Sequence, residues 1–382
     1  MRRTICISLL IPLLLSLPVR ALEPLEEDHF DLKCTAAVLM ERETGTLLYA
    51  KNEHQRLSPA SVTKVMTLLL IAEAVDSGAL SPEDTVTGSA RAASMGGSQI
   101  WLKEGETMSA AEMTKCIAVV SANDCAVAMA EHLCGSEEAF TARMNRRAAE
   151  LGMADTHFTN CTGLFEDPDH YTSAYDVALM SRELLSHAFV RQFTSIWTDT
   201  IRGGAFGLTN TNKLVRFYPG CTGLKTGFTS TAMFCLSASA MKGETEYIAV
   251  ILHGDTSQHR FDDARTLLDY AFANYALVTP RLEDLPPVAV KLGTAGSVGV
   301  VCGRSGRILV EKRLQGALEG AAELPREVSA PVEAGQQLGT LYLRAQGETI
   351  TSVPLLAAEA VPRVTVWQVW QGLVRVLCGQ KK

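Results

Sequence analysis

Hydrophobic and polar residues alternate with a period of two at both ends of the first 275 residues, which predicts strands flanking a helical region. The segments Ala36–Glu41 and Thr46–Lys51 enclose a glycine-containing turn and predict a β-hairpin. A second hairpin is expected from Ala232–Met241 and Glu246–His253, again around a short turn with glycine. Strands this far apart in sequence can join one sheet only through long-range pairing.

Between the hairpins the pattern changes to helix. Ser58-Pro59 has the capping and first-turn residues of a helix, and Val62–Ala74 is apolar on nearly every side, which predicts a buried helix. Residues 105–150, Ser173–Ser186 and 257–275 are also expected to be helical. Residues 155–170, rich in Gly, Pro, Asp and His, predict a loop. The expected fold class is therefore α/β (α+β), an antiparallel sheet flanked by helices with a helical subdomain.

Prolines divide the remainder of the chain. Pro280, Pro286 and Pro287 precede residues 288–356, whose short alternating runs rich in Val, Gly and Thr predict a small all-β domain. Pro362 precedes a tail with a different pattern. The predicted organisation is a large mixed domain over 30–276, a small β-rich domain over 280–358, and a terminal helix over 363–382.

The terminal helix is amphipathic. Its polar residues recur every three or four positions in one narrow stripe, while Trp367, Trp370 and aliphatic residues cover the rest and Lys381-Lys382 ends the chain. A wide apolar face with tryptophans and terminal lysines is typical of a helix lying in a membrane interface. Its polar residues, including Arg375, argue against a helix that spans the bilayer. The alternative is a terminal helix docked on the β domain.

The N-terminus resembles a targeting segment. Arg2 and Arg3 precede the apolar run Ile5–Leu17, and Val19-Arg20-Ala21 offers a cleavage site, so residues 1–21 are expected to form a secretory signal peptide. An uncleaved anchor is the alternative, although thirteen apolar residues are short for a bilayer. The protein is therefore expected to be exported.

Composition narrows the function. The chain has 382 residues, 47% hydrophobic and 20% charged, which excludes a disordered or disulfide-scaffold protein. Its formal charge is −7, and −10 without the three arginines of residues 1–21, so no basic surplus exists for binding nucleic acid. Nine cysteines follow the signal segment, with neither C-x-x-C spacing nor histidine clusters, and they are expected to be mostly buried apolar residues rather than metal ligands.

Three short motifs carry the candidate chemistry. Ser61-Val62-Thr63-Lys64 places a hydroxyl and an amine on one helical face, and burial of the lysine would favour the neutral amine that a serine nucleophile needs as its base. Ser121-Ala122-Asn123 is expected where a helix ends and offers a hydroxyl and a carboxamide. Lys225-Thr226-Gly227 precedes the second hairpin, where its cation and hydroxyl could bind a carboxylate and its glycine would let a substrate backbone approach. Together, in this order, they form a strong signal.

With these motifs the chain resembles the penicillin-recognising serine enzymes. The segments PASVTKVMT (59–67), SANDCAVAMAEHLCGS (121–136), LGMADTHFTNCTGL (151–164), HYTSAYDVALM (170–180) and GLKTGFTS (223–230) resemble the D-alanyl-D-alanine carboxypeptidases of the low-molecular-mass penicillin-binding protein 5 type. The resemblance spans residues 30 to 275, and the β domain and tail are similar less specifically. One departure is Ala122, where that family usually has glycine.

The resemblance implies roles for the reacting residues. Ser61 would attack the carbonyl between the two D-alanines of a peptidoglycan stem pentapeptide, Lys64 would accept its proton, and Ser121 would relay a proton to the leaving D-alanine. Penicillins and other β-lactams would acylate the same serine. No metal or organic cofactor is implied.

The resemblance also implies the binding residues. Asn123 would hold the substrate amide, and Lys225 and Thr226 would bind the terminal carboxylate. The backbone N–H groups of Ser61 and Phe228, the residue after Gly227, would form the oxyanion hole. The implied location is the outer face of the cytoplasmic membrane, with the terminal helix on the membrane surface.

Two alternatives remain open from sequence. A β-lactamase would need a deacylating glutamate, but Glu166 lies in Phe165-Glu166-Asp167-Pro168 and not in an E-x-x-L-N setting. A non-catalytic cell-wall binding protein could keep the fold. We expect His157 and His170 to pack or cap the loop and Asp124 and Asp176 to cap or pair locally. Trp101 either lines the cleft or packs.

Overall fold

The computed structural model describes residues 22–279, 285–303 and 307–377; the predicted signal peptide and Lys381-Lys382 lie outside them. The chain forms two compact units. One comprises Glu23–Val278 with Arg307–Arg313, and the other is built from Thr279–Gly306 and Leu314–Lys382. Arg307–Arg313 belongs to the first unit because its strand β14 (Ile308–Glu311) pairs with β10 (Tyr275–Val278).

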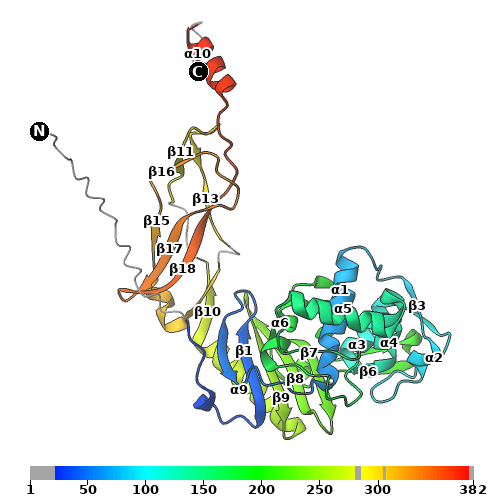
Figure 1. Cartoon of the computed structure of the whole chain (residues 1–382). Helices are drawn as coiled ribbons and strands as arrows, with labels where there is room; N and C mark the ends of the chain where they lie inside the picture. The colour runs from blue at the N-terminus through cyan, green and yellow to red at the C-terminus, as the bar shows by residue number, and fades with distance from the viewer. Residues whose placement is uncertain (1–21, 280–284, 304–306, 378–382) are drawn as a thin grey trace, which may run out of the picture. The chain divides into compact units, whose positions relative to one another are not determined.

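A five-stranded antiparallel sheet organises the first unit (Figure 1). Its order is β2-β1-β9-β8-β7, and all four neighbouring pairs are antiparallel. The strands are β1 (Cys34–Glu41), β2 (Leu47–Lys51), β7 (Cys221–Thr229), β8 (Met233–Lys242) and β9 (Thr245–Gly254). Both predicted hairpins are confirmed, and their pairing through β1 and β9 makes β7 an edge strand.

Helices cover both faces of this sheet. Successive side chains of a strand point to opposite faces, and Ala36, Val38 and Met40 of β1 join the main core together with α1 (Lys64–Asp76) and α6 (Ala174–Leu184). The intervening residues of β1 are also buried, on the face where α9 (Ser257–Asn274) packs along β1, β8 and β9. As predicted, α1 is buried on almost every side.

The remaining helices form a subdomain around α1. Four main helices build it, and two of them, α3 and α5, begin at capping serines whose hydroxyls accept backbone N–H bonds. They are α3 (Ala110–Val120), α4 (Asn123–Cys134), α5 (Glu137–Glu150) and α7 (Ala188–Thr194). The smaller elements are η1 (Glu27–His29), η2 (Ala60–Thr63), η3 (Arg202–Gly204), α2 (Ala90–Ala93), α8 (Leu214–Phe217), and the two-stranded ribbons β3 (Thr85–Thr87) with β4 (Thr107–Ser109) and β5 (Thr198–Ile201) with β6 (Phe206–Thr209).

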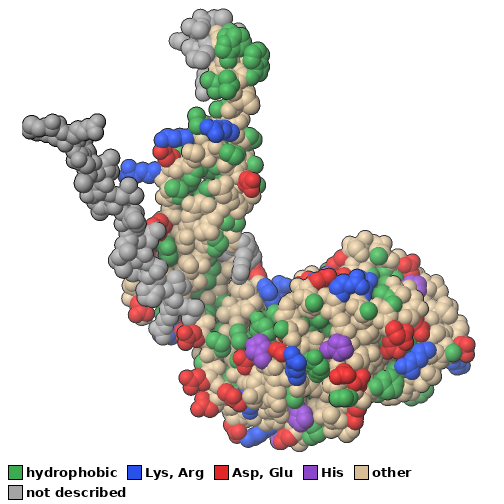
Figure 2. Space-filling view, in the orientation of Figure 1, with side chains coloured by type: hydrophobic (Ala, Val, Ile, Leu, Met, Phe, Trp, Pro, Cys, Tyr) green, Lys and Arg blue, Asp and Glu red, His purple; other side chains and the backbone are tan. Residues whose placement is uncertain are grey.

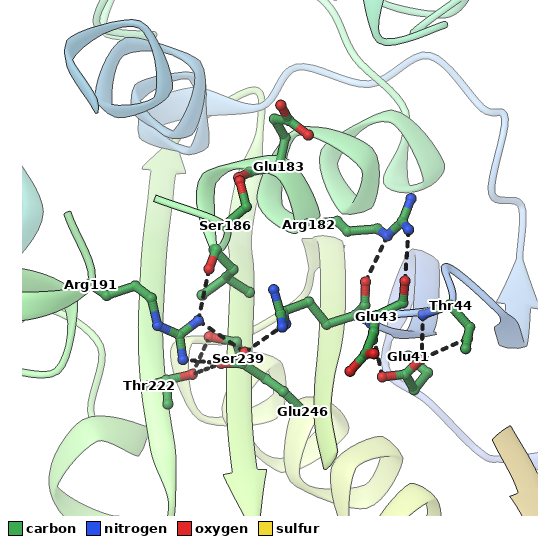
Figure 3. A network of polar contacts seen from close by, with 12 residues as sticks. Glu41, Glu43, Thr44, Arg182, Glu183, Ser186, Arg191, Thr222, Ser239 and Glu246 are labelled. Carbon is green, nitrogen blue, oxygen red and sulfur yellow. Dashed lines mark hydrogen bonds and ion pairs between the residues drawn. The ribbon is translucent and has the colours of Figure 1, made fainter. Parts of the chain in front are cut away.

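A buried carboxylate ties β7 to its surroundings (Figure 3). Glu246 of β9 is 3% exposed and receives two hydrogen bonds from Arg191 of α7, at 2.9 and 3.1 Å. The Thr222 hydroxyl of β7 donates to the same carboxylate at 2.7 Å, and Arg42 forms a further ion pair at 3.1 Å. Because a buried charge is tolerated only when it is paired, this network fixes the start of β7 against α7 and the sheet.

The second unit is β-rich, as predicted. Strands β11, β12 and β16 form one sheet, and the other has the order β13-β18-β17-β15. Their bounds are β11 (Val288–Lys291), β12 (Ser297–Val298), β13 (Val300–Cys302), β15 (Glu319–Glu323), β16 (Glu327–Ser329), β17 (Gln337–Ala345) and β18 (Glu348–Ala357), with η4 (Lys312–Ala317) before β15. Val288, Val298 and Val361 belong to a small core of their own.

A helix, α10 (Val366–Leu377), follows the β-rich unit. Its described side chains include the exposed Val366, Trp367, Val369 and Trp370, and the two indole rings stack with centroids 5.0 Å apart. Across the described residues, the helices are too short or too polar to cross a bilayer. The described residues of the whole chain include eight cysteines, which are all free thiols, and five of these are buried.

Candidate active site

Ser61 and Lys64 lie at the start of the buried central helix. The sequence predicted a helix capped by Ser58, but the structure begins with the 3₁₀ turn η2, preceded by Pro59, and α1 starts at Lys64. Residues i and i+3 eclipse one another in a 3₁₀ turn, so the predicted alignment is retained. Lys64 Nζ donates a hydrogen bond of 2.9 Å to Ser61 Oγ.

Burial changes the chemistry of Lys64. The side chain has no exposed surface, and this desolvation lowers its pKa to about 7. Nζ also donates to the carbonyl oxygen of Thr162 at 2.8 Å, which fixes the amine beside Ser61. A neutral amine in hydrogen-bond contact with a hydroxyl is the arrangement that general-base activation of serine requires.

A loop supports this turn from the other side. Gly163 has a φ of +70°, and an added Cβ would lie 1.9 Å from the carbonyl oxygen of Ala60, so only glycine fits there. The buried His170 accepts the N–H of Thr159 at Nδ1, which leaves the proton on Nε2 for a 2.7 Å hydrogen bond to Thr63 Oγ1. Its pKa falls to about 4 through burial. The predicted loop-packing role of His170 agrees with these contacts.

Ser121 and Asn123 occupy the turn between α3 and α4. Ser121 ends α3 in the left-handed conformation, with φ +65°, and its buried Oγ has no hydrogen-bond partner among the described residues. Asn123 Nδ2 donates to the carbonyl oxygen of Gly96 at 2.8 Å, while its buried Oδ1 is also unpartnered within the described chain. Buried polar atoms normally have partners, so these two oxygens are suited to a substrate. Asn123 would thus accept an N–H through Oδ1.

Strand β7 forms the opposite wall. Lys225 and Thr226 are only 1% and 6% exposed, and burial together with the charges of Lys64 and Arg260 holds the pKa of Lys225 well below its usual range. Lys225 Nζ donates to the carbonyl oxygen of Thr226, whose hydroxyl donates to Thr211 Oγ1 at 2.6 Å. An incoming carboxylate would offset the burial of the amine and favour its charged form.

Gly227 has a structural role in addition to the predicted one. An added Cβ would lie 2.7 Å from the carbonyl oxygen of Pro59 and 3.1 Å from the nitrogen of Ser61. The glycine therefore lets β7 approach the serine turn, and its predicted role in admitting a substrate backbone stays a prediction. This close approach places the next residue, Phe228, beside the Ser61 segment. The Phe228 ring is 56% exposed and contacts Phe234, with centroids 4.5 Å apart.

Comparisons with known proteins agree with this geometry. Residues 23–256 match the family model described as D-alanyl-D-alanine carboxypeptidase, and residues 284–363 match that of the penicillin-binding protein 5 C-terminal domain. The chain belongs to the D-alanyl-D-alanine carboxypeptidase family. It is 44% identical to D-alanyl-D-alanine carboxypeptidase DacF of Bacillus subtilis over 330 residues, 85% of each chain.

Solved structures place the chain on the same fold. Penicillin-binding protein 5 from Haemophilus influenzae aligns with a TM-score of 0.79 and 28% identity, covering 87% of this chain and 99% of that one. Penicillin-binding protein D2 from Listeria monocytogenes, solved in the ampicillin-bound form, aligns at 0.58 with 32% identity over 64% of this chain and 99% of that one. The predicted penicillin-recognising fold is confirmed, and this D-alanyl-D-alanine carboxypeptidase is a serine-type peptidase. The β-lactamase and non-catalytic alternatives are not favoured.

Two residues of this carboxypeptidase site escaped the sequence analysis. Arg260 of α9 is 8% exposed and donates to the carbonyl oxygens of Gly227 at 3.0 Å and Cys235 at 3.3 Å. Gly163 allows the loop to pack against the serine turn. The sequence gives only a weak signal for either residue, because the contacts of Gly163 and Arg260 are with residues that are far away in the chain.

Other singled-out residues have structural roles in the carboxypeptidase. The carboxylate of Asp124 accepts the N–H groups of Ile100 and Leu102, and that of Asp176 accepts the N–H of Asp155. These bonds join loops that are distant in sequence, whereas local caps or pairs were expected. Trp101 is 65% exposed and packs edge-on against Phe206.

Glu166 has no recorded contact with Ser61 or Lys64 among the described residues. Its Oε1 accepts hydrogen bonds from Ser230 Oγ at 2.7 Å and from the N–H of Thr231 at 3.2 Å, in the turn after β7. This position is not that of a base beside the nucleophile.

A potential metal-ligand cluster lies elsewhere in the carboxypeptidase. Within the described chain, Glu73, Glu183 and His187 offer ligand atoms within 4.8 Å of one another. Arg147 already joins the two carboxylates, at 2.7 Å from Glu73 and 2.8 Å from Glu183. The cluster therefore acts as an ion-pair network between helices α1, α5 and α6.

Proposed function

We propose that Ser61 is the nucleophile of this D-alanyl-D-alanine carboxypeptidase and that Lys64 is its base. Ser61 Oγ attacks the carbonyl carbon between the two terminal D-alanines of a peptidoglycan stem pentapeptide, and Lys64 Nζ takes the hydroxyl proton. This proposal rests on the 2.9 Å hydrogen bond between Lys64 Nζ and Ser61 Oγ, and on the burial that lowers the pKa of Lys64 and so favours its neutral form.

The remaining steps follow from the walls of the site. The tetrahedral oxyanion is stabilised by the N–H groups of Ser61 and Phe228. The C–N bond then breaks, and Ser121 passes a proton to the departing D-alanine amine. Water hydrolyses the resulting Ser61 ester, releasing the shortened stem and restoring the free hydroxyl. The unpartnered Ser121 Oγ supports the relay role.

Substrate orientation is assigned to four groups. Lys225 and Thr226 bind the free carboxylate, which makes the enzyme specific for a chain end. Asn123 Oδ1 accepts an amide N–H, and Gly227 keeps Phe228 close to Ser61. Penicillins, whose carboxylate and strained amide occupy the same positions, form a slowly hydrolysed adduct. The ampicillin-bound Listeria relative supports this part of the proposal.

Mass spectrometry of the intact protein after mixing with penicillin tests the nucleophile. We expect a long-lived adduct that is lost in Ser61→Ala and kept in Ser77→Ala, a control serine exposed at the end of α1. D-alanine release from a pentapeptide should follow the same pattern. Rapid turnover of penicillin without a stable adduct would support a β-lactamase instead.

The protein is further proposed to act at the outer face of the cytoplasmic membrane, after cleavage of residues 1–21. Figure 2 shows the hydrophobic side chains gathered on α10. Their exposure, with the stacked Trp367 and Trp370, supports binding of this helix to a membrane surface. Deletion of 363–382 should move the exported protein from the membrane fraction to the soluble one, and unchanged partitioning would contradict the anchor.

A further inference from the structure

Trp101 is held in solvent by its own backbone. Its neighbours Ile100 and Leu102 are at most 2% exposed, and their N–H groups both donate to the buried Asp124 carboxylate at 3.0 Å. Between them Trp101 has a left-handed φ of +54° and is 65% exposed. A large aromatic residue rarely adopts a positive φ, and backbone strain of this kind gathers at functional sites. The loop is therefore built to present this indole rather than to bury it.

Arg202 fixes the same loop from the other side. This residue of η3 also has a φ of +54°, and its guanidinium donates to the carbonyl oxygen of Ile100 at 2.9 Å. It pairs with both oxygens of Glu106, at 2.7 and 3.2 Å, and the N–H of Lys103 donates to Glu106 at 3.0 Å. Because a bidentate arginine–carboxylate pair is geometrically specific, the platform under the indole is rigid before any ligand arrives.

A pocket opens beside the indole. Its volume is about 610 Å³, within the range of small-molecule sites, and its lining is Ile100, Trp101, Lys103, Glu106, Arg202 and Phe206. The Phe206 ring meets the indole edge-on, with centroids 5.8 Å apart. Within the described chain, neither Trp101 Nε1 nor Lys103 Nζ has a hydrogen-bond acceptor. The pocket thus offers an aromatic face together with two free donors.

A pyranose sugar matches this lining. The C–H bonds on one face of the ring carry partial positive charge and suit the negative face of an indole, while hydroxyl and acetamido oxygens at the ring edge can accept hydrogen bonds. An apolar side chain would fit less well, because it would cover the two donors without supplying acceptors. The chemistry of the pocket therefore favours a saccharide.

The loop that presents Trp101 also supports the proposed substrate site. Its Gly96 carbonyl oxygen accepts the Asn123 side-chain amide at 2.8 Å, and its Ser98 carbonyl oxygen accepts the Asn123 N–H at 2.7 Å. The stem peptide assigned to that site is attached to a glycan of N-acetylated amino sugars. A saccharide site on this loop would therefore bind the polymer that carries the substrate.

We propose that Trp101 is the stacking platform of a saccharide site and that the site binds N-acetylated amino sugars of the peptidoglycan glycan. Trp101 Nε1 and Lys103 Nζ donate to oxygens at the edge of the sugar ring. The identity of the polymer rests on the proposed function of Ser61, whereas sugar binding by the pocket does not require that serine.

A soluble chain of three N-acetylglucosamine units, which contains no peptide, tests the site on the full-length protein. We expect saturable binding by calorimetry, and saturation-transfer NMR should show the strongest transfer to C–H protons of the sugar rings. Trp101→Leu keeps an apolar side chain but removes the aromatic face, and it should raise Kd roughly tenfold. Trp101→Phe keeps an aromatic ring and should recover part of the affinity.

Two comparisons separate the possible failures. Phe217→Leu removes another ring, 63% exposed and outside the pocket lining, and it should bind the saccharide like wild type. Urea unfolding checks that the Trp101 variants are folded, and the NMR measurement on wild type needs no variant. Absence of saturable binding, or an equal Kd in folded Trp101→Leu and wild type, would overturn the saccharide site. Trp101-dependent binding of a free pentapeptide instead of the saccharide would overturn it too, by assigning the pocket to peptide.

D-alanine release from the free pentapeptide is measured separately. Release without saccharide binding would contradict the saccharide site alone. Saccharide binding without release would contradict the proposed function of Ser61 and leave the chain as a glycan-binding protein.

Discussion

The Arg260 guanidinium holds the carbonyl oxygen of Gly227 at 3.0 Å. This carbonyl and the N–H of Phe228 belong to one planar trans peptide group, so they point in opposite directions. Arg260 binds from the sheet side, where it also reaches the Cys235 carbonyl. It therefore aims the Phe228 N–H away from the sheet, toward the position proposed for the oxyanion.

Loss of Arg260 should slow acylation. We expect Arg260→Ala to reduce the rate constant for acylation by penicillin about 10- to 100-fold, because one oxyanion donor is no longer fixed. The prior binding constant should change much less. Arg260→Lys should recover part of the rate, whereas Arg265→Ala, on the same helix and paired with Asp262, should match wild type. Stopped-flow kinetics separate the two constants; an effect confined to binding would contradict this role.

The acylation rate should depend on pH through Lys64. Burial lowers its pKa to about 7, and only the neutral amine accepts a proton. Acylation by penicillin should therefore rise about tenfold per pH unit below 7 and level off above it. The measurement is the second-order rate constant between pH 5.5 and 8.5. A rate constant that still rises tenfold per pH unit up to pH 8.5, as for an ordinary lysine with a pKa of 10.5, would show that burial does not tune this amine.

His170 should make stability depend on pH. Its folded pKa of about 4 lies below the ordinary histidine value of 6.5, so the unfolded chain takes up the proton first as pH falls. Stability is therefore lost between pH 6.5 and 4, by up to about 3 kcal/mol. Urea unfolding at several pH values measures this loss. His170→Gln should be less stable at pH 7 and should show a smaller decline; an unchanged decline would assign it to other groups.

Substitutions at Ser121 can separate the effect of backbone strain on stability from the effect of the hydroxyl group on activity. Both Ser121→Ala and Ser121→Gly remove the hydroxyl, and D-alanine release should fall about 100-fold in each. Since φ is +65°, the glycine variant should be about 1 kcal/mol more stable than the alanine variant.

Ser77 is the matched control for this pair, because its φ of −80° suits alanine. Glycine should be the less stable replacement there. Urea unfolding measures both pairs, and the same order of stability at the two positions would contradict the strain at Ser121.

Sequence reasoning predicted the parts of the fold that depend on local pattern. Periodicity and turn residues depend on contacts between residues that are close in sequence. They were therefore sufficient to predict both hairpins, the buried helix after Ser61 and the loop before Ser173. The i, i+3 spacing also predicted the Ser61–Lys64 contact, although the turn proved to be 3₁₀. Pattern alone could not reveal that β14 pairs with β10, since that strand lies beyond a proline-rich segment.

Tertiary contacts explain what was missed at the site. The contacts of Gly227 with Pro59 and Ser61 gave no sequence signal, because only the folded chain brings these residues together. Arg260 gave no signal because its partners are backbone carbonyls of distant strands. Glu166 was weighed as a catalytic base, and its hydrogen bonds to the turn after β7 became visible only in three dimensions.

The unpaired edge of β7 also bears on self-association. A strand with free N–H and C=O groups can pair with the same strand of another molecule, which is a common route to aggregation. Here η2 packs against β7 at Gly227. The turn that carries Ser61 therefore shields this part of the strand edge, and we expect substitutions that move η2 away from β7 to favour self-association.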